Sequence, residues 1–148
     1  MPEPELILCD TSVVAVLDRA IAQPELLEAW PDAARERLDH AVLAMSVITL
    51  AETRAGWLHA NWGERRVAAA QLRLSSYASI PVDRGALDVW PALSAASRSR
   101  GWNASHNDLW IAATAIAHQL PLASCDRDHT RIERDDLELI HLPVGRSA

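Results

Sequence analysis

The sequence predicts an α/β fold in which a parallel sheet of about five strands is covered by helices on both faces. Short apolar segments of strand length alternate along the chain with longer segments of helical pattern. Strands that are apolar throughout are typical of parallel sheets buried between two helical layers. The chain has 148 residues, of which 49% are hydrophobic, so we expect one domain over 1–148 with a core over about 6–143.

The order of the elements follows from the apolar segments and from the residues that cap or break helices. We expect strands at 6–9, 42–45, 78–82, 122–125 and 137–142. We expect helices at 13–20, 24–40, 47–60, 64–74, 85–100 and 105–120. Ser12 and Ser46 are the expected caps of the first and third helices, and Pro31 interrupts the second. The helix at 105–120 is the clearest, because its apolar residues recur at helical spacing up to Pro121.

The composition limits the classes of function. The chain carries 20 acidic and 14 basic residues, a net charge of −6, and every basic residue is an arginine. Receiver domains and aspartyl phosphatases normally use a lysine near the phosphoryl group, so the absence of lysine argues against both. The first residues, MPEPELIL, lack the basic segment of a signal peptide, and no apolar run could cross a membrane. We therefore expect a soluble cytoplasmic protein whose two cysteines, Cys9 and Cys125, are reduced core thiols.

Four carboxylates occupy corresponding places in this pattern. Asp10 and Asp126 directly follow the first and fourth expected strands. Glu52 lies about two turns into the helix after the second strand, and Asp108 lies in the first turn of the helix before the fourth. Functional residues of such sheets gather beyond the carboxyl ends of the strands, where the strand order changes direction. We therefore expect the four acids to converge there.

Converging carboxylates require positive charge, because like charges raise one another's pKa values. Asp10 has no basic residue near it in sequence before Arg19, so we expect a metal ion rather than a protein group as its partner. Mg²⁺ or Mn²⁺ bound by a few carboxylates would suit hydrolysis of a phosphodiester by activated water.

Each acid also has a simpler structural explanation. Asp10 is suited to capping the first helix, and Asp126 to beginning a turn. Ser105 and Asp108 have the spacing of a capping box, and Glu52 follows Thr49 at the same spacing inside a helix. Only the joint alignment of the four with the strand ends favours the functional interpretation.

These segments resemble the PIN-domain ribonucleases, and more narrowly the VapC toxins of bacterial toxin–antitoxin pairs. The resemblance covers about residues 6–143. It rests on four motifs in order: the strand ending in Asp10-Thr11-Ser12; SVITLAE at 46–52; Asn107-Asp108 followed by LWIAATAIA; and Ser124-Cys125-Asp126-Arg127-Asp128. The third motif is the most specific of the four.

The resemblance implies an Mg²⁺- or Mn²⁺-dependent endoribonuclease, the toxin of such a pair. Asp10, Glu52, Asp108 and Asp126 would be the metal-binding acids, with Asp10 central. The other residues that it implies for the second shell or for substrate are Ser12, Asn107, Ser124 and Asp128. The implied partners are RNA, a cognate antitoxin and a second copy of the chain in a homodimer. A PIN-like protein-binding module without activity and a nuclease acting on DNA are the alternatives.

The chain departs from the family pattern at three places. Ser124 replaces the usual threonine and keeps its hydroxyl. His129 replaces the usual phenylalanine, either as a packing residue or as one that approaches phosphate. The segment 20–41 is longer than is typical, and we expect it to alter the mouth of the cleft or the antitoxin-binding surface.

Overall fold

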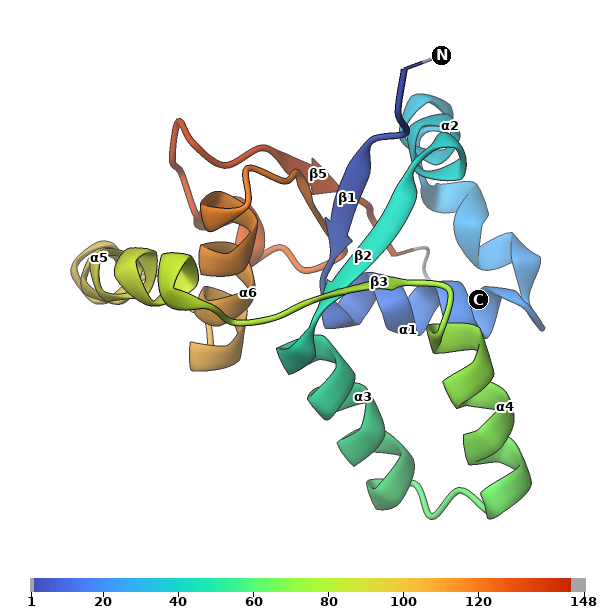
Figure 1. The fold of residues 1–148 in the computed structure, drawn as a ribbon. Coiled ribbons are helices and arrows are strands. Elements are labelled where there is room, and N and C mark those ends of the chain that lie inside the picture. The colour runs from blue at the N-terminus through green and yellow to red at the C-terminus, as the bar shows by residue number, and fades with distance from the viewer. Residues whose placement is uncertain (1, 145–148) are drawn as a thin grey trace.

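The computed structural model describes residues 2–144, and it confirms the parallel five-stranded sheet that the sequence predicts (Figure 1). The strands are β1 (Leu6–Cys9), β2 (Val42–Ser46), β3 (Ala78–Ile80), β4 (Leu122–Ser124) and β5 (Leu139–His141). Their order across the sheet is β3-β2-β1-β4-β5, and all four pairings are parallel. β1 is therefore the central strand, and the chain continues to one side of it before crossing to the other.

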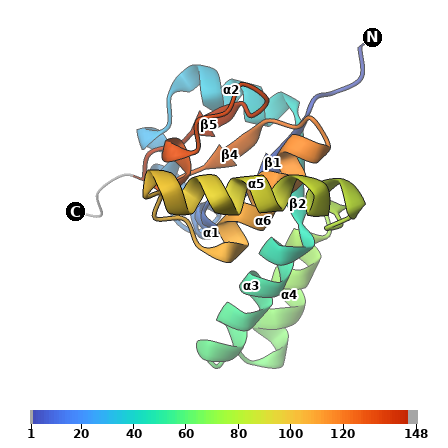
Figure 2. The same ribbon diagram turned by 90° about the vertical axis from the view of Figure 1, so that its left-hand side faces the viewer.

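The helices form a layer on each face of the sheet. They are α1 (Thr11–Ala20), α2 (Asp32–His40), α3 (Val47–His59), α4 (Glu64–Leu74), α5 (Arg84–Arg100) and α6 (His106–Ala117), with short 3₁₀ turns η1 (Pro24–Ala29) and η2 (His129–Arg131). α5 and α6 lie together over one face, whereas α1 and α2 lie over the other (Figures 1 and 2). α3 and α4 leave the body on the same side of the molecule and project away from the sheet.

The sheet separates two hydrophobic cores, one on each face, because side chains alternate along its strands. Ile7 and Cys9 of β1 pack into the core under α1 and α2, while Leu8 between them packs into the core under α5 and α6. Ala44 and Met45 of β2 divide in the same way. Successive residues of a strand face opposite sides of a sheet, so both faces of β1 and β2 must be apolar.

Several element boundaries differ from those expected. β3, β4 and β5 are shorter, and α6 ends at Ala117 rather than close to Pro121. Gln119 there has a φ of 55°, which leaves the helical region, and the Leu120 N–H turns back to the carbonyl of Ala115. No helix within residues 2–144 is long and apolar enough to cross a membrane.

The helical part of the segment 20–41 lies away from the expected mouth of the cleft, whereas its first residues, Ile21, Ala22 and Gln23, line a small pocket together with Trp62 and Arg66. α2 ends directly before β2, so it occupies the edge of the sheet where the strands begin. Arg37 of α2 forms ion pairs there with Glu5 before β1 and Glu138 before β5. The carboxyl ends of the strands lie at the opposite edge, which this segment leaves open.

Gly101 ends α5 in the left-handed region, with a φ of 68°. We expect Gly101→Ala to lower the free energy of unfolding by about 1–2 kcal/mol, because an L side chain is strained in that conformation. A methyl group at Gly101 would meet no heavy atom within 4 Å, so backbone strain is the only penalty.

Gly56 inside α3 is the matched control, since a methyl group there also meets nothing within 4 Å. We expect Gly56→Ala to leave stability unchanged or raise it by up to about 1 kcal/mol, because alanine favours a helix over glycine. Urea denaturation of the two variants measures both effects. Equal stability changes would contradict the assignment of a left-handed cap at Gly101.

Candidate active site

Asp10 stands where β1 ends and α1 begins, at the change of direction in the strand order. Its backbone N–H bonds to the carbonyl of Ala123 in β4, and its Oδ1 accepts a hydrogen bond from the N–H of Val13 at 3.1 Å. Asp10 is therefore the N-cap of α1, and the expectation that Ser12 would cap this helix is wrong. β1 and β4 lead to opposite sides of the sheet at this point, which is where ligands bind in folds of this kind.

The Asp10 carboxylate is fully engaged by the protein. Besides the Val13 N–H, Oδ1 accepts from Ser12 Oγ at 2.5 Å, and Oδ2 accepts from Ser124 Oγ at 2.5 Å and from His129 Nδ1 at 3.1 Å. Only 2% of Asp10 is exposed. The expectation that Asp10 has no protein partner is therefore wrong. The histidine that contacts it, His129, is distant in sequence, so the sequence did not reveal the contact.

The two serines must point their hydroxyl hydrogens at Asp10. Ser12 Oγ accepts from the N–H of Cys125 at 2.9 Å, and Ser124 Oγ accepts from the N–H of Asp126 at 3.0 Å. Each serine oxygen is thus an acceptor for the backbone after β4, and its own hydrogen is free to donate to the carboxylate. The network ties α1 to the end of β4 and favours the ionised form of Asp10.

His129 lies inside this network with 1% of its surface exposed. Its Nδ1 lies 3.0 Å from Ser124 Oγ, whose hydrogen is already directed at Asp10, so Nδ1 carries a hydrogen and donates. On the other side of the ring, Nε2 lies 3.7 Å from Oδ1 of Asp108. Nε2 has no hydrogen-bond partner among the residues that the structure describes.

The contact shifts the pKa values of both groups in opposite directions. Burial acts to raise the pKa of Asp10, but the hydrogen bond and the charge of His129, with the bonds from both serines, hold it below its ordinary value. Burial acts to lower the pKa of His129, but the hydrogen bond to Asp10 and the charges of Asp10, Asp108 and Asp126 raise it. Three carboxylates therefore act on one buried imidazole.

The two carboxylate oxygens of Asp108 make different contacts, one within the capping of α6 and one toward His129. Oδ2 accepts from the N–H of Ser105 at 3.1 Å, while the N–H of Asp108 donates to Ser105 Oγ at 3.1 Å. This is the capping box at the start of α6 that the spacing suggested. Oδ1 is the oxygen that faces His129, so the structural explanation and the functional one apply to different atoms of the same side chain.

Asp126 follows β4 in a turn that brings it beside the same imidazole. Its Oδ1 accepts from the N–H of Asp128 at 2.8 Å, and Asp128 directly precedes the short turn η2 that carries His129. Asp126 is half-buried and its charge contributes to the raised pKa of His129. The turn after β4 therefore brings Asp126 and His129 to Asp10 together.

Glu52 joins the site indirectly. Thr11, the neighbour of Asp10, donates to Oε1 of Glu52 at 2.7 Å and lies 3.2 Å from the buried hydroxyl of Thr49. Glu52 is half-buried on α3. Asn107 is exposed in the first turn of α6, and no part of the structure tests its expected role.

The acids do not form a ready metal site as they stand. Within residues 2–144, no three acidic, histidine or cysteine side chains are grouped so that they could hold a metal ion. The four donors to Asp10 explain part of this, because they occupy the oxygens that a metal would take. The carboxylates of Asp10, Asp108 and Asp126 are nonetheless oxygen donors of the kind that Mg²⁺ and Mn²⁺ prefer.

An apolar groove of about 310 Å³ begins beside Glu52 and runs between α1, α3 and α4. Its floor and walls include Val14, Gly56, Trp57 and Trp62. The two tryptophan rings stack at 5.9 Å between centroids, and the guanidinium of Arg66 lies 3.7 Å from the centre of the Trp62 ring. These tryptophans thus line a groove as well as packing on each other.

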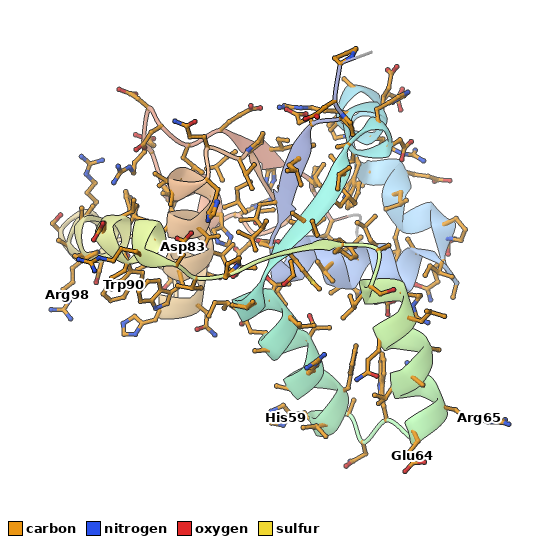
Figure 3. The ribbon with its side chains drawn as sticks, viewed as in Figure 1. His59, Glu64, Arg65, Asp83, Trp90 and Arg98 are labelled. Atoms are coloured by element: carbon orange, nitrogen blue, oxygen red, sulfur yellow. The ribbon has the colours of Figure 1, made fainter. Side chains whose placement is uncertain are left out.

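The sequence has two clusters of arginines, Arg65-Arg66 and Arg98–Arg100, and they lie on different parts of the molecule. Arg65 is at the outer end of α4, near Glu64 and across from His59 of α3, whereas Arg98 is at the far end of α5 beyond Trp90 and Asp83 (Figure 3). They therefore do not form one continuous basic surface.

The sequence did not predict the contacts of three residues at the site, His129, Thr11 and Thr49. The sequence offered two possible roles for His129, and neither was a contact with Asp10. A signal was present, because His129 follows Asp126 by three residues in a segment that returns to the sheet. The hydroxyls of Thr11 and Thr49 gave no signal beyond their proximity to Asp10 and Glu52.

Comparison with known proteins identifies the class. The chain belongs to the PIN-domain family, because the sequence model of that family matches residues 7–135. Ribonuclease VapC4 of Mycobacterium tuberculosis is 34% identical over 102 residues, which are 65% of this chain and 74% of that protein. Sequence and fold thus agree with the family resemblance.

Solved structures give the same result. A chain of VapBC-5 from Mycobacterium tuberculosis, a toxin–antitoxin system, matches with a TM-score of 0.69 and 27% identity over 93% of this chain and 99% of that one. A chain of VapBC-1 from nontypeable Haemophilus influenzae matches with a TM-score of 0.73 and 21% identity, over 92% and 97%. The second likeness concerns the fold alone.

The hydrogen-bond network predicts a difference between two substitutions at Ser124. Ser124→Ala removes a donor to Asp10 and the acceptor of the Asp126 N–H, so we expect it to lower the free energy of unfolding by about 1–3 kcal/mol. Ser124→Thr keeps the hydroxyl, and we expect a smaller loss. Urea denaturation ranks the two, and an alanine variant at least as stable as the threonine variant would contradict the network.

Proposed function

We propose that the protein is an Mg²⁺- or Mn²⁺-dependent endoribonuclease that acts as the toxin of a toxin–antitoxin pair. One observation carries the proposal: three acids from different elements gather where β1 and β4 end. The carboxylates of Asp10 and Asp108 lie 3.1 and 3.7 Å from the two ring nitrogens of His129, and Ser124 binds both Asp10 and the backbone of Asp126. Glu52 adjoins them through Thr11. The name of the relative VapC4, a ribonuclease, supports RNA as the substrate.

The bound ions would activate water and stabilise the leaving oxygen of a phosphodiester. On this proposal Asp10, Glu52, Asp108 and Asp126 hold them, and Ser12 and Ser124 fix the position of Asp10. Direct coordination by Asp10 requires one of its four donors to be exchanged for the ion. The weaker contacts on Asp10 are those at 3.1 Å, from Val13 and His129, and only His129 is a side chain.

Metal ions would also let an acidic protein bind an acidic substrate. The net charge of −6 opposes RNA, and the arginine clusters do not form one surface (Figure 3). Local positive charge at the acids therefore supplies the attraction for the phosphate at the cleavage point. Asn107 and Asp128, at the rim of the acids, are the proposed substrate contacts.

The groove between α1, α3 and α4 is the proposed docking site for an antitoxin. Its lining is largely apolar, and it ends at Thr11 and Glu52 of the candidate active site. An apolar peptide with a basic residue at its end would fill the groove and pair with the acids. The name of the similar VapBC-5 structure supports such a partner, and the homodimer belongs to the same proposal.

A test of the activity uses purified protein with matched fluorescent RNA and DNA panels in Mg²⁺, Mn²⁺ or EDTA. We expect cleavage of RNA that needs metal and falls by about 100-fold or more in Asp10→Asn and Asp108→Asn, because each loses a charge that holds the ion. Asparagine can still cap a helix, so both variants are expected to fold.

Asp39→Asn is the matched control, because Asp39 is an exposed acid of α2 at the other edge of the sheet. Its activity is expected to equal that of the unmodified protein. Cleavage that survives EDTA would contradict the proposal. Cleavage of DNA alone would favour the DNA nuclease, and Mn²⁺ binding without cleavage of either panel would favour a binding module.

A further inference from the structure

A pocket lined by arginines continues the apolar groove at the end away from the acids. The groove between α1, α3 and α4 extends from Thr11 and Glu52 to Asp18, Arg19 and Trp62. A second pocket, of about 320 Å³, shares those last three residues with the groove, so the two hollows are continuous. Three arginines line this second pocket, which we call the arginine pocket: Arg19, Arg66 and Arg73.

The arginine pocket carries positive charge that the chain does not balance. Arg73 forms an ion pair with Asp18 through two hydrogen bonds, at 2.5 and 3.2 Å, so these two charges compensate each other. Within residues 2–144, neither Arg19 nor Arg66 forms an ion pair. Two guanidinium groups without a counter-charge therefore line one pocket of a protein whose net charge is −6.

The aromatic wall of the groove holds Arg66 in position. Its guanidinium lies 3.7 Å from the centre of the Trp62 ring, and Trp62 stacks on Trp57 at 5.9 Å between centroids. A guanidinium that stacks on a ring can still donate hydrogen bonds from the N–H groups at its edge. Arg66 is thus already ordered before an acceptor arrives, which reduces the entropy cost of binding one.

We propose that the arginine pocket binds an acidic side chain of the same peptide that fills the apolar groove. This inference rests on the proposed function, because that peptide is the proposed antitoxin segment. The groove is negative at Glu52 and positive at Arg19 and Arg66, so a complementary peptide is basic at one end, apolar in the middle and acidic at the other. Carboxylates are acceptors that a guanidinium binds with two parallel hydrogen bonds.

The length of the groove determines the spacing of the two charges on the peptide. From Thr11 to Arg19 the axis of α1 rises by about 12 Å. A helical peptide covers that length in about eight residues, and an extended peptide covers it in about four. We therefore expect the basic and acidic residues of the peptide at one of these two separations, with apolar residues between them.

RNA is another ligand that arginines attract, but the surroundings of this pocket favour a peptide. A nucleic-acid backbone is charged along its whole length. The arginine pocket instead adjoins a groove lined by Val14, Gly56 and Trp57, and it includes the exposed side chain of Ile21. Apolar surface beside a few isolated charges suits an amphipathic peptide that lays its apolar side into a groove.

The first residues of the segment 20–41 form part of the arginine pocket. Ile21, Ala22 and Gln23 line it between the end of α1 and the start of η1. The sequence predicted that this segment alters either the mouth of the cleft or the antitoxin-binding surface. On this proposal it alters the antitoxin-binding surface, because it borders the place where the acidic side chain binds.

The test selects peptides from a random library of about 14 residues displayed on phage, a length that spans the groove in either conformation. The purified full chain is the target. We expect selected peptides to carry an acidic residue about eight or about four positions from a basic one. Selection on the double variant Arg19→Glu, Arg66→Glu is expected to replace that acidic residue with a basic one, because the charge of the pocket is reversed.

The double variant Arg65→Glu, Arg98→Glu is the matched control, because it makes the same change of charge elsewhere. Arg65 is at the outer end of α4 and Arg98 is at the far end of α5 (Figure 3). We expect this control to select the same peptides as the unmodified protein. All four arginines are exposed, so both double variants are expected to fold.

Fluorescence anisotropy of one selected peptide, labelled with fluorescein, measures the contribution of each arginine. We expect Arg19→Gln and Arg66→Gln to weaken binding about 3-fold each, because the charge pairs are partly exposed. A peptide whose acidic residue is changed to glutamine should bind the unmodified protein more weakly, and the same change should have little effect on the double glutamine variant. A merely structural role of the arginines would not produce this dependence.

Two results would overturn the inference. Selected peptides without an acidic residue at either separation would show that the arginines do not contribute to docking, and the groove would remain the docking site. Weaker RNA binding by Arg19→Glu, Arg66→Glu, with unchanged peptide selection, would assign the arginines to RNA. Selection of no peptide at all would remove the docking site and the inference together, whereas metal-dependent RNA cleavage tests the nuclease separately.

Discussion

The hydrogen bonds that converge on the buried carboxylate of Asp10 hold the functional edge of the sheet together. The donors come from α1, from the end of β4 and from η2, so one side chain joins the central strand to α1 and to the segment after β4 that carries Asp126. Charged acceptors with several donors are strong contacts in a buried setting. The position of Asp126 depends on this arrangement, because Ser124 binds the Asp126 backbone and Asp10 with the same oxygen atom.

The same arrangement concentrates negative charge where water is scarce. Burial alone would favour the neutral form of Asp10, yet its pKa is lowered, because His129 and the serines stabilise the anion more than burial opposes it. A protonated imidazole would place its positive charge between the carboxylates of Asp10 and Asp108.

The architecture could be predicted from the sequence, because the patterns that indicate strands and helices are each contained in a short stretch of chain. Apolar strands buried on both faces and helices with one apolar stripe are visible in short windows, and the acids follow the strands directly. The partner of Asp10 could not be predicted in this way. His129 reaches it through a turn whose path depends on packing between β4 and β5, across 119 positions of sequence. Asp10 and Ser12 are both good capping residues two positions apart, so only the structure decides that Asp10 caps α1.

The apolar groove ends at the candidate active site, so a peptide bound in the groove would lie next to the acids. Thr11 and Glu52 line the end of the apolar groove, and Thr11 is also bound to Glu52 and adjacent in sequence to Asp10. A chain lying in the groove would have to reach the acids at that end, whereas RNA can approach from the open edge beyond β1 and β4. The stacked tryptophans stiffen the wall of the groove on α3 and give it a surface that exists before any partner binds. If the proposed peptide docks there, inhibition would need no change in the sheet, only a basic group placed beside Glu52 at the end of the groove.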